Sequence, residues 1–245
     1  RDGAAPRAPR GVTPFPRRTP IPLVPGEEVT ITKIKMISPH GGWAIGHQED
    51  GVSRVLYSQD GGETWMDRTP PLDIAEISYT SRELTAYFYN DQLAWVIFPD
   101  QRSNPAQATH QVWITEDAGK QWRSSLPLPV RGVELDFIPR EFAFINPQQG
   151  WLRVHLGYMM MHDYTNLYRT EDGGTTWERI IDPESNQLQG YHNTGLAFAS
   201  ATHGWVTKDN LGGAEPVLEQ TRDGGETWEI LSLPAPAGLS WIDSP

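Results

Sequence analysis

The sequence contains no cysteine, which excludes disulfide bonds, thiolate metal sites and cysteine nucleophiles. It has no apolar run approaching the ~18 residues that a membrane-spanning helix needs, and no long segment has the helical period of 3.6 residues. No signal peptide is visible, but the chain begins at Arg1 rather than at a methionine. We therefore expect an N-terminal export or anchoring segment outside this sequence and an extracytoplasmic location.

Basic residues are scarce beyond the first 25 positions. Residues 1–25 hold five of the 20 basic groups and one of the 31 acidic groups, so the other residues keep 15 basic and 30 acidic groups, a charge of −15. A body this acidic repels phosphate backbones, which excludes a nucleic-acid partner for the folded part. Seven prolines also lie within residues 1–25, and we predict an extended, polyproline-like tether there.

Turn-forming residues are abundant, with 23 glycines and 21 prolines. Together they make about 18% of the chain against about 12% on average, a composition typical of many short strands and tight turns. Four octapeptides repeat within this background, namely SQDGGETW (Ser58–Trp65), TEDAGKQW (Thr115–Trp122), TEDGGTTW (Thr170–Trp177) and TRDGGETW (Thr221–Trp228). Their aspartates are 57, 55 and 51 positions apart. A repeat of about 50 residues indicates an array of similar structural units.

A second marker keeps step with the first. A tryptophan precedes each octapeptide at Trp43, Trp95, Trp151 and Trp205, with separations of 52, 56 and 54 residues. Each unit contains four short apolar or β-branched runs bounded by turn residues, which predicts four antiparallel strands. We predict an all-β protein, a β-propeller built of four-stranded antiparallel blades, with four recognisable blades plus the first strand of a fifth.

The blade boundaries follow from the two markers. We place the tether at residues 1–25 and the propeller at 26–245, with blades over about 29–72, 73–130, 131–184 and 185–236. Residues 237–245 contain LSWIDSP (Leu239–Pro245), which aligns with IKMISP (Ile34–Pro39) and FAFINP (Phe142–Pro147). This segment is either the start of a further blade or a closing strand.

The octapeptide Ser/Thr-x-Asp-x-Gly-x-Thr-Trp resembles the Asp box, or BNR repeat, of sialidase-like propellers. The same motif occurs in xyloglucan-hydrolase propellers, in sortilin-type receptors and in the photosystem II stability and assembly factor family, which is the nearest type. The resemblance implies a hairpin turn between strands three and four, stabilised by the aspartate and by glycines with positive φ. The residues that carry it are Ser58, Asp60, Gly62, Thr64, Trp65, Thr115, Asp117, Gly119, Trp122, Thr170, Asp172, Gly174, Thr176, Trp177, Thr221, Asp223, Gly225, Thr227 and Trp228.

Calcium is an alternative for aspartate-rich turns. The octapeptides lack the alternating oxygen ligands of an EF-hand loop, so we expect a structural role and no metal. In the second unit Ala118, Lys120 and Gln121 depart from the pattern, and we expect a slightly weaker turn there that still forms.

Functional residues are expected on the propeller face opposite these turns. The loops between strands two and three (47–53, 99–111, 155–166 and 208–216) and the connections between blades lie on that face, and they are the least repetitive parts of the chain. The candidates for a partner or ligand face are Arg102, His110, Arg131, Arg140, Tyr158, His162, Asp163, Tyr164, Tyr191, His192 and Asp209.

Catalytic and metal-binding signatures are weak. His155, His162 and Asp163 suggest a metal site, but they lack a known ligand spacing, so structural or solvent roles are favoured. A sialidase would place three arginines around its substrate and show an early Arg-Ile-Pro signature. The segment FIPR (Phe137–Arg140) only loosely resembles that signature. We predict no catalytic residue, no metal and no cofactor.

These observations lead to one functional expectation and one alternative. We expect a non-catalytic extracytoplasmic propeller scaffold that binds a protein partner or assists complex assembly, with a membrane-associated complex among the partners considered. The alternative is a glycoside hydrolase or glycan-binding propeller of sialidase-like or xyloglucanase-like type.

Overall fold

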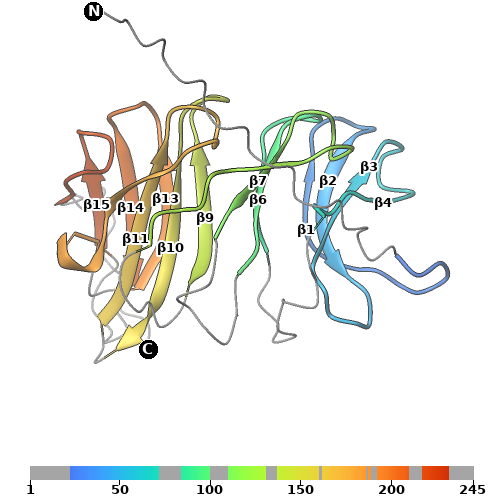
Figure 1. Ribbon diagram of the computed structural model, residues 1–245, viewed down its shortest axis with the longest axis horizontal. Helices are drawn as coiled ribbons and strands as arrows, with labels where there is room; N and C mark the ends of the chain where they lie inside the picture. Colours follow the sequence, from blue (N-terminus) through green and yellow to red (C-terminus); the bar gives the residue numbers. More distant parts are fainter. Residues whose placement is uncertain are drawn as a thin grey trace, which may run out of the picture.

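The computed structural model describes residues 23–71, 84–99, 110–130, 137–159, 162–185, 187–188, 192–209 and 217–231. Within these ranges the chain forms sixteen strands in four antiparallel sheets, each with its strands in sequence order (Figure 1). Most of the predicted tether (residues 1–22) and the predicted fifth-blade strand (237–245) lie outside the described residues.

Each sheet falls within one predicted blade range. Blade 1 contains β1 (Thr30–Met36), β2 (Gly42–His47), β3 (Arg54–Ser58) and β4 (Met66–Asp67). Blade 2 contains β5 (Thr85–Phe88), β6 (Ala94–Ile97), β7 (Val112–Thr115) and β8 (Arg123–Ser124). Blade 3 contains β9 (Ile138–Phe144), β10 (Gly150–Met159), β11 (His162–Thr170) and β12 (Glu178–Ile181). Blade 4 contains β13 (His192–Phe198), β14 (Gly204–Asp209), β15 (Val217–Thr221) and β16 (Glu229–Ile230).

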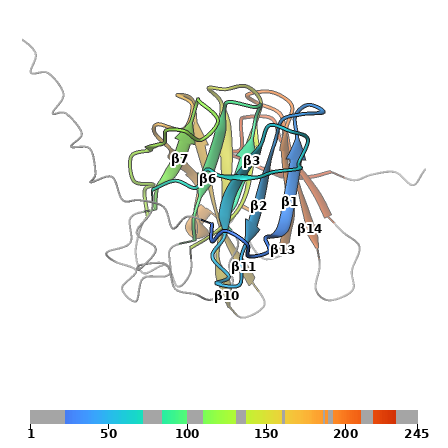
Figure 2. The same cartoon turned by 90° about the vertical axis from the view of Figure 1, so that its right-hand side faces the viewer.

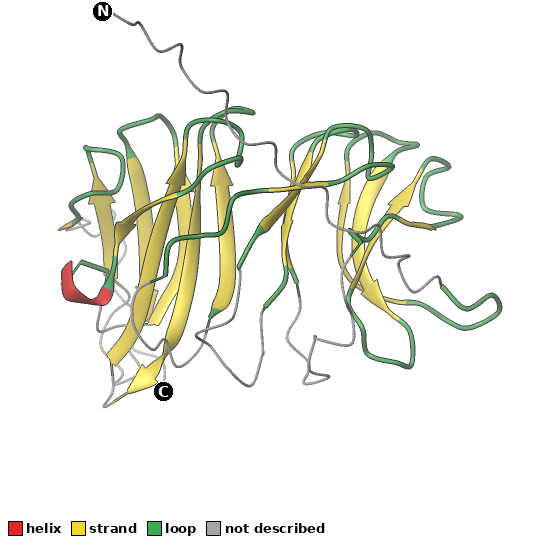
Figure 3. Ribbon diagram, viewed as in Figure 1, coloured by secondary structure: helices red, strands yellow, loops and turns green. Residues whose placement is uncertain are grey.

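The four sheets stand side by side in chain order, which is the arrangement of propeller blades. Figure 3 shows strands throughout the described part, with one short 3-10 helix at Pro183–Ser185. In the view turned by 90°, blade 1 lies nearest to the viewer (Figure 2). The predicted fold class, a β-propeller of four-stranded antiparallel blades, is confirmed. The fourth strands β4, β8 and β16 have two residues each and β12 has four, and all of them begin on the residue after the octapeptide tryptophan.

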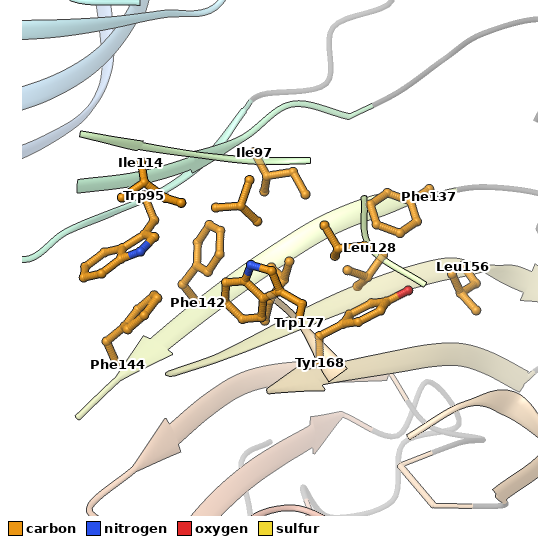
Figure 4. Close-up of a cluster of buried hydrophobic side chains, with 13 residues drawn as sticks. Trp95, Ile97, Ile114, Leu128, Phe137, Phe142, Phe144, Leu156, Tyr168 and Trp177 are labelled. Atoms are coloured by element: carbon orange, nitrogen blue, oxygen red, sulfur yellow. The ribbon is translucent and has the colours of Figure 1, made fainter. Parts of the chain in front are cut away.

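Apolar side chains fill the spaces between successive blades. One cluster joins blades 1 and 2 around Trp43 and Val96, and another joins blades 3 and 4 around Trp151 and Val206. The cluster between blades 2 and 3 is shown in Figure 4, where Trp95, Phe142, Phe144, Tyr168 and Trp177 approach one another from facing sheets. Neither face of a single blade could remain in water with such side chains, so burial between blades drives their stacking.

Each of three blades sets an aromatic ring against the tryptophan of the blade before it. Phe88 stacks on Trp43 at 5.2 Å, Phe144 on Trp95 at 3.8 Å and Phe198 on Trp151 at 3.6 Å between ring centroids. The same tryptophans also donate their indole N–H to a carbonyl of the next blade. The acceptors are Asn90 for Trp43, Gly173 for Trp95 and Gly224 for Trp151, each at 2.8 Å.

The four octapeptides form equivalent turns between strands three and four, which we call the Asp turns. In the first turn, Ser58 Oγ donates to Asp60 Oδ1 (2.8 Å) and accepts the Gly62 N–H (2.8 Å), and Asp60 Oδ1 accepts the Thr64 N–H (2.9 Å). The other three turns repeat this set of bonds with Thr115, Thr170 and Thr221 in place of the serine. The second turn forms as expected, although Ala118 takes a φ of 61° that a side chain disfavours.

The Asp turns and the β10–β11 hairpin lie at opposite faces of the molecule (Figure 1). In Figure 1 the turns lie along the upper edge, and the hairpin between β10 and β11 reaches the lower edge. That hairpin corrects one expectation, because residues 155–166 do not form a loop. The two strands pair from Gly150↔Thr170 to Met159↔His162, with a register shift between His155 and Gly157.

Candidate functional site

A group of polar side chains, most of them buried, lies at the face opposite the Asp turns, where blade 3 meets blade 4. The long β10–β11 hairpin brings His155 and Asp163 to this end of blade 3, and β13 begins there with His192 and Asn193. Asp163 is 1% exposed. We call Asp163, His155, His192, Asn193 and Thr165 the Asp163 network.

Asp163 accepts hydrogen bonds through both of its carboxylate oxygens. His155 Nδ1 contacts Oδ1, while the Asn193 N–H donates to Oδ2 at 3.3 Å and His192 Nδ1 lies 3.4 Å from Oδ2. Burial by itself disfavours the charged carboxylate, but the hydrogen bond from His155 and the Asn193 N–H outweigh it and lower the pKa of Asp163. An ionised aspartate therefore joins a strand of blade 3 to the first strand of blade 4.

Asn193 extends the same connection. Its Nδ2 donates to Thr165 Oγ1 at 3.0 Å and to the Leu188 carbonyl at 2.9 Å. Thr165 belongs to β11 and is fully buried, whereas Leu188 lies in the connection between the two blades. A buried polar network with this many partners restricts the two blades to one relative position.

An ion pair lies beside the Asp163 network, closer to the inner strands. Arg153 on β10 is almost fully buried, and its guanidinium lies 3.5 Å from Glu141 Oε2 on β9. Burial raises the pKa of Glu141, and the charge of Arg153 opposes that rise. Burial lowers the pKa of Arg153, and the negative charges of the Glu141 and Asp163 carboxylates oppose that decrease. The site thus combines one carboxyl group with a raised pKa and one with a lowered pKa.

Two other buried cations toward this face are paired within single blades. In blade 1, Arg54 is 2% exposed and makes two bonds to the Asp50 carboxylate, at 3.0 and 2.6 Å. In blade 4, Lys208 Nζ donates to Glu219 Oε1 at 2.7 Å. These pairs satisfy charges that strand pairing has buried, so they serve the scaffold.

The predicted face residues have different surroundings. His110 is buried and stacks on Phe137 with centroids 3.5 Å apart, and Tyr164 is half-buried against the cluster between blades 2 and 3. Arg140 and Asp209 are exposed, while His192 contacts Asp163. Exposure was expected for His110 and Asp163, and burial corrects that expectation.

The remaining predicted residues lie partly or wholly outside the described part. Arg102, Arg131 and Tyr191 are not among the described residues. Tyr158 and His162 are placed by their backbone in the β10–β11 hairpin, where Tyr158 pairs with Asp163. Among the side chains that the structure describes, no group of three or more histidines and carboxylates could hold a metal ion. No helix in this part is long and apolar enough to cross a membrane.

Four members of the site were not anticipated from the sequence, namely Glu141, Arg153, Thr165 and Asn193. Arg153 carried a usable signal, because it interrupts a strand whose neighbours Leu152 and Val154 are apolar. A charged residue within a buried strand requires a partner. Asn193 gave no comparable signal, because its partners come from another blade.

Comparisons with known proteins support the fold. No protein-family model matches the chain, and no curated protein matches its sequence. Among solved structures, the family 74 xyloglucanase of Xanthomonas campestris is similar with a TM-score of 0.52 and 16% identity, over 80% of this chain and 29% of the enzyme. The chain therefore spans less than a third of that enzyme's length.

Two further structures are similar. A family 117 glycoside hydrolase of the marine bacterium Zobellia galactanivorans aligns with a TM-score of 0.50 and 11% identity, over 83% of this chain and 69% of the enzyme. YCF48 bound to a D1 peptide aligns with a TM-score of 0.39 and 15% identity, over 84% of this chain and 81% of YCF48. At these identities, the similarities to the xyloglucanase and to the family 117 hydrolase show the propeller fold and nothing finer.

Proposed function

We propose that this chain is an Asp-box propeller that acts as a non-catalytic extracytoplasmic scaffold and binds a protein partner on the face opposite the Asp turns. One observation carries the proposal. Asp163, the most buried carboxylate among the described residues of that face, is fully engaged by His155, His192 and the Asn193 N–H. A carboxylate held by three neighbours inside the protein stabilises the surface around it and is not available to attack a substrate.

The exposed residues around the network provide the contact surface in this proposal. Arg140 lies on β9, next to Glu141, and its side chain is exposed. Arginine is enriched in protein interfaces because its planar guanidinium makes several directed hydrogen bonds. Acidic or polar groups on a partner's surface would bind the Arg140 guanidinium, which is held on a strand rather than on a loop.

The test is affinity isolation of the tagged chain from its native cells, followed by measurement of subunit stoichiometry. A stoichiometric protein subunit that Arg140→Glu removes supports the proposal. The matched control is Arg222→Glu, which reverses the charge of an exposed arginine in the fourth Asp turn on the opposite face. Loss of the subunit from both variants, or from neither, would contradict a partner site on the predicted face.

A second function is favoured by Glu141. A glycosidase keeps its general acid protonated by raising the pKa of that carboxyl group, and burial raises the pKa of Glu141. Glu141 is also about one-third exposed. A glycan-binding or glycoside hydrolase activity would use Glu141 as its acid.

Hydrolysis assays on sialosides and β-glucans, together with a glycan-binding screen, separate the two functions. Turnover that Glu141→Gln abolishes and Glu229→Gln leaves intact would establish the hydrolase and overturn the scaffold proposal. Glu229 is an exposed acid on the outermost strand of blade 4, remote from the inner strands. Retained turnover in Glu141→Gln would remove Glu141 from the mechanism.

A further inference from the structure

Every described boundary between blades repeats one contact. The tryptophan on the second strand of a blade receives an aromatic ring from the first strand of the next blade, as Phe88, Phe144 and Phe198 show. The interplanar angles are 3°, 17° and 1°, so the rings lie nearly parallel. Because the stack occurs at all three described boundaries, it is a repeated feature of the blade-to-blade contact.

The position of the ring explains why glycine occupies the neighbouring position on the second strand in blades 3 and 4. A Cβ at Gly150 would lie 2.3 Å from the Phe144 ring, and a Cβ at Gly204 would lie 2.6 Å from the Phe198 ring. Phe144 and Phe198 are therefore each held between a glycine of their own blade and a tryptophan of the preceding blade, whereas Phe88 pairs with Ala94. The contact requires a flat side chain at this position of the first strand.

Trp205 is the fourth tryptophan of the set, and it lies on the last described blade. Its three counterparts Trp43, Trp95 and Trp151 are at most 1% exposed, whereas Trp205 is partly exposed. Strand alternation places Trp205 and Thr207 on the face of β14 opposite the buried Val206. Within the described ranges, no ring stacks on Trp205 and no acceptor meets its indole N–H.

The sequence after β16 contains the missing side chain. Leu239-Ser240-Trp241-Ile242-Asp243 matches Phe142–Asn146 and Leu196–Ser200 position by position, with Trp241 aligned to Phe144 and Phe198. Asp243 aligns with Asn146 and Ser200, whose side chains accept the N–H groups two and three residues later in their turns. The segment thus has both the ring and the turn-forming residue.

We propose that Trp241 stacks on Trp205, so that residues 239–243 dock on the open face of blade 4 as the inner strand of a further blade. The connection is long enough. Eleven residue steps separate Ile230 at the end of β16 from Trp241, and they span up to about 36 Å. A six-residue strand such as β14 is only about 20 Å long.

A double-mutant cycle in the full chain tests this pair. Trp205→Ala and Trp241→Ala are combined, and the equilibrium constants of urea unfolding are compared. We expect the two substitutions to couple by a factor of about 3 to 10, as buried aromatic pairs do. The control cycle combines Trp241→Ala with Ile34→Ala. Ile34 lies on blade 1, and its exposed fraction is 60%. The control pair should be additive.

A spectroscopic measurement covers the case in which Trp205→Ala does not fold. Two stacked indoles give an exciton couplet in the far-ultraviolet circular dichroism spectrum, and Trp241→Phe should remove that couplet while keeping an apolar ring. The proposal would be overturned if the effects of Trp205→Ala and Trp241→Ala were additive and Trp241→Phe left the circular dichroism spectrum unchanged. A dimer in light scattering whose dissociation follows Trp205→Ala and Ile34→Ala, but not Trp241→Ala, would also overturn it, because a second copy would then cover blade 4.

Discussion

The indole N–H of Trp151 donates to the carbonyl of Gly224, 73 residues later, at 2.8 Å. The donor lies on the second strand of blade 3, and the acceptor lies in the Asp turn of blade 4. Trp95 and Gly173 repeat this bond between blades 2 and 3. The Asp turns therefore do more than reverse the chain, because two of them present a carbonyl to the preceding blade.

The first prediction concerns this bond. Trp151→Phe keeps an aromatic ring but removes the N–H, which leaves the Gly224 carbonyl buried without its donor. We expect a loss of about 1–3 kcal/mol in the free energy of unfolding, measured by urea denaturation. Trp205→Phe is the control, because no described acceptor meets its N–H, and it should lose less than about 1 kcal/mol. Equal losses would refute the role of the bond.

The second prediction concerns the glycine that precedes Trp43, Trp151 and Trp205, a position that Ala94 occupies before Trp95. Gly150→Ala places a methyl group 2.3 Å from the Phe144 ring, which must move and weaken its stack on Trp95. We expect a destabilisation of about 1–3 kcal/mol, the usual cost of overpacking. Gly41→Ala is the matched control, because its Cβ would meet no atom closer than 3.5 Å. Thermal unfolding of both variants checks the difference.

The third prediction concerns acid stability of the Asp turns. The Thr64 hydroxyl and N–H and the Ser58 hydroxyl lower the pKa of Asp60 to about 2. In the fourth turn, burial opposes ionisation of Asp223, but hydrogen bonds from Thr227 and Thr221 outweigh it and lower that pKa to about 2 as well.

Both aspartates have a lower pKa in the folded chain than the value of about 3.9 expected in the unfolded chain. Their contribution to stability is therefore present above pH ~4 and is lost as the pH falls toward ~2. The Asp60→Asn, Asp223→Asn double variant should show a weaker dependence of unfolding on pH in this window. Glu63→Gln, an exposed acid of the first turn, is the control. An unchanged pH dependence in the double variant would be inconsistent with these pKa values.

The fourth prediction concerns the Asp163 network. Asp163→Asn replaces one acceptor oxygen by a donor, so either His155 or the Asn193 N–H loses its partner inside the protein. We expect a destabilisation of about 1–3 kcal/mol at neutral pH. Because the pKa of Asp163 is lowered in the folded state, the difference from the parent chain should shrink on acidification below pH ~4. Asp209→Asn, an exposed aspartate of blade 4, should have no measurable effect.

The repeat and its turns could be predicted from the sequence, because the interactions that define them are local. The bonds of an Asp turn join residues two to four positions apart, such as Ser58, Asp60 and Thr64, so the octapeptide contains all the necessary partners. Alternating apolar residues and regular spacing likewise indicated four similar antiparallel sheets. The order of the sheets followed from the chain order.

The arrangement of the candidate functional face depended on the tertiary structure. His155 and Asp163 were expected in a loop, but pairing of β10 with β11 continues to Met159 and His162 and carries Asp163 into the interior. The partners of Asp163 include Asn193 and His192, about 30 residues later and in another blade. Strand patterns indicate which side chains turn inward, but only the packing of one blade against the next determines which buried charge meets which donor.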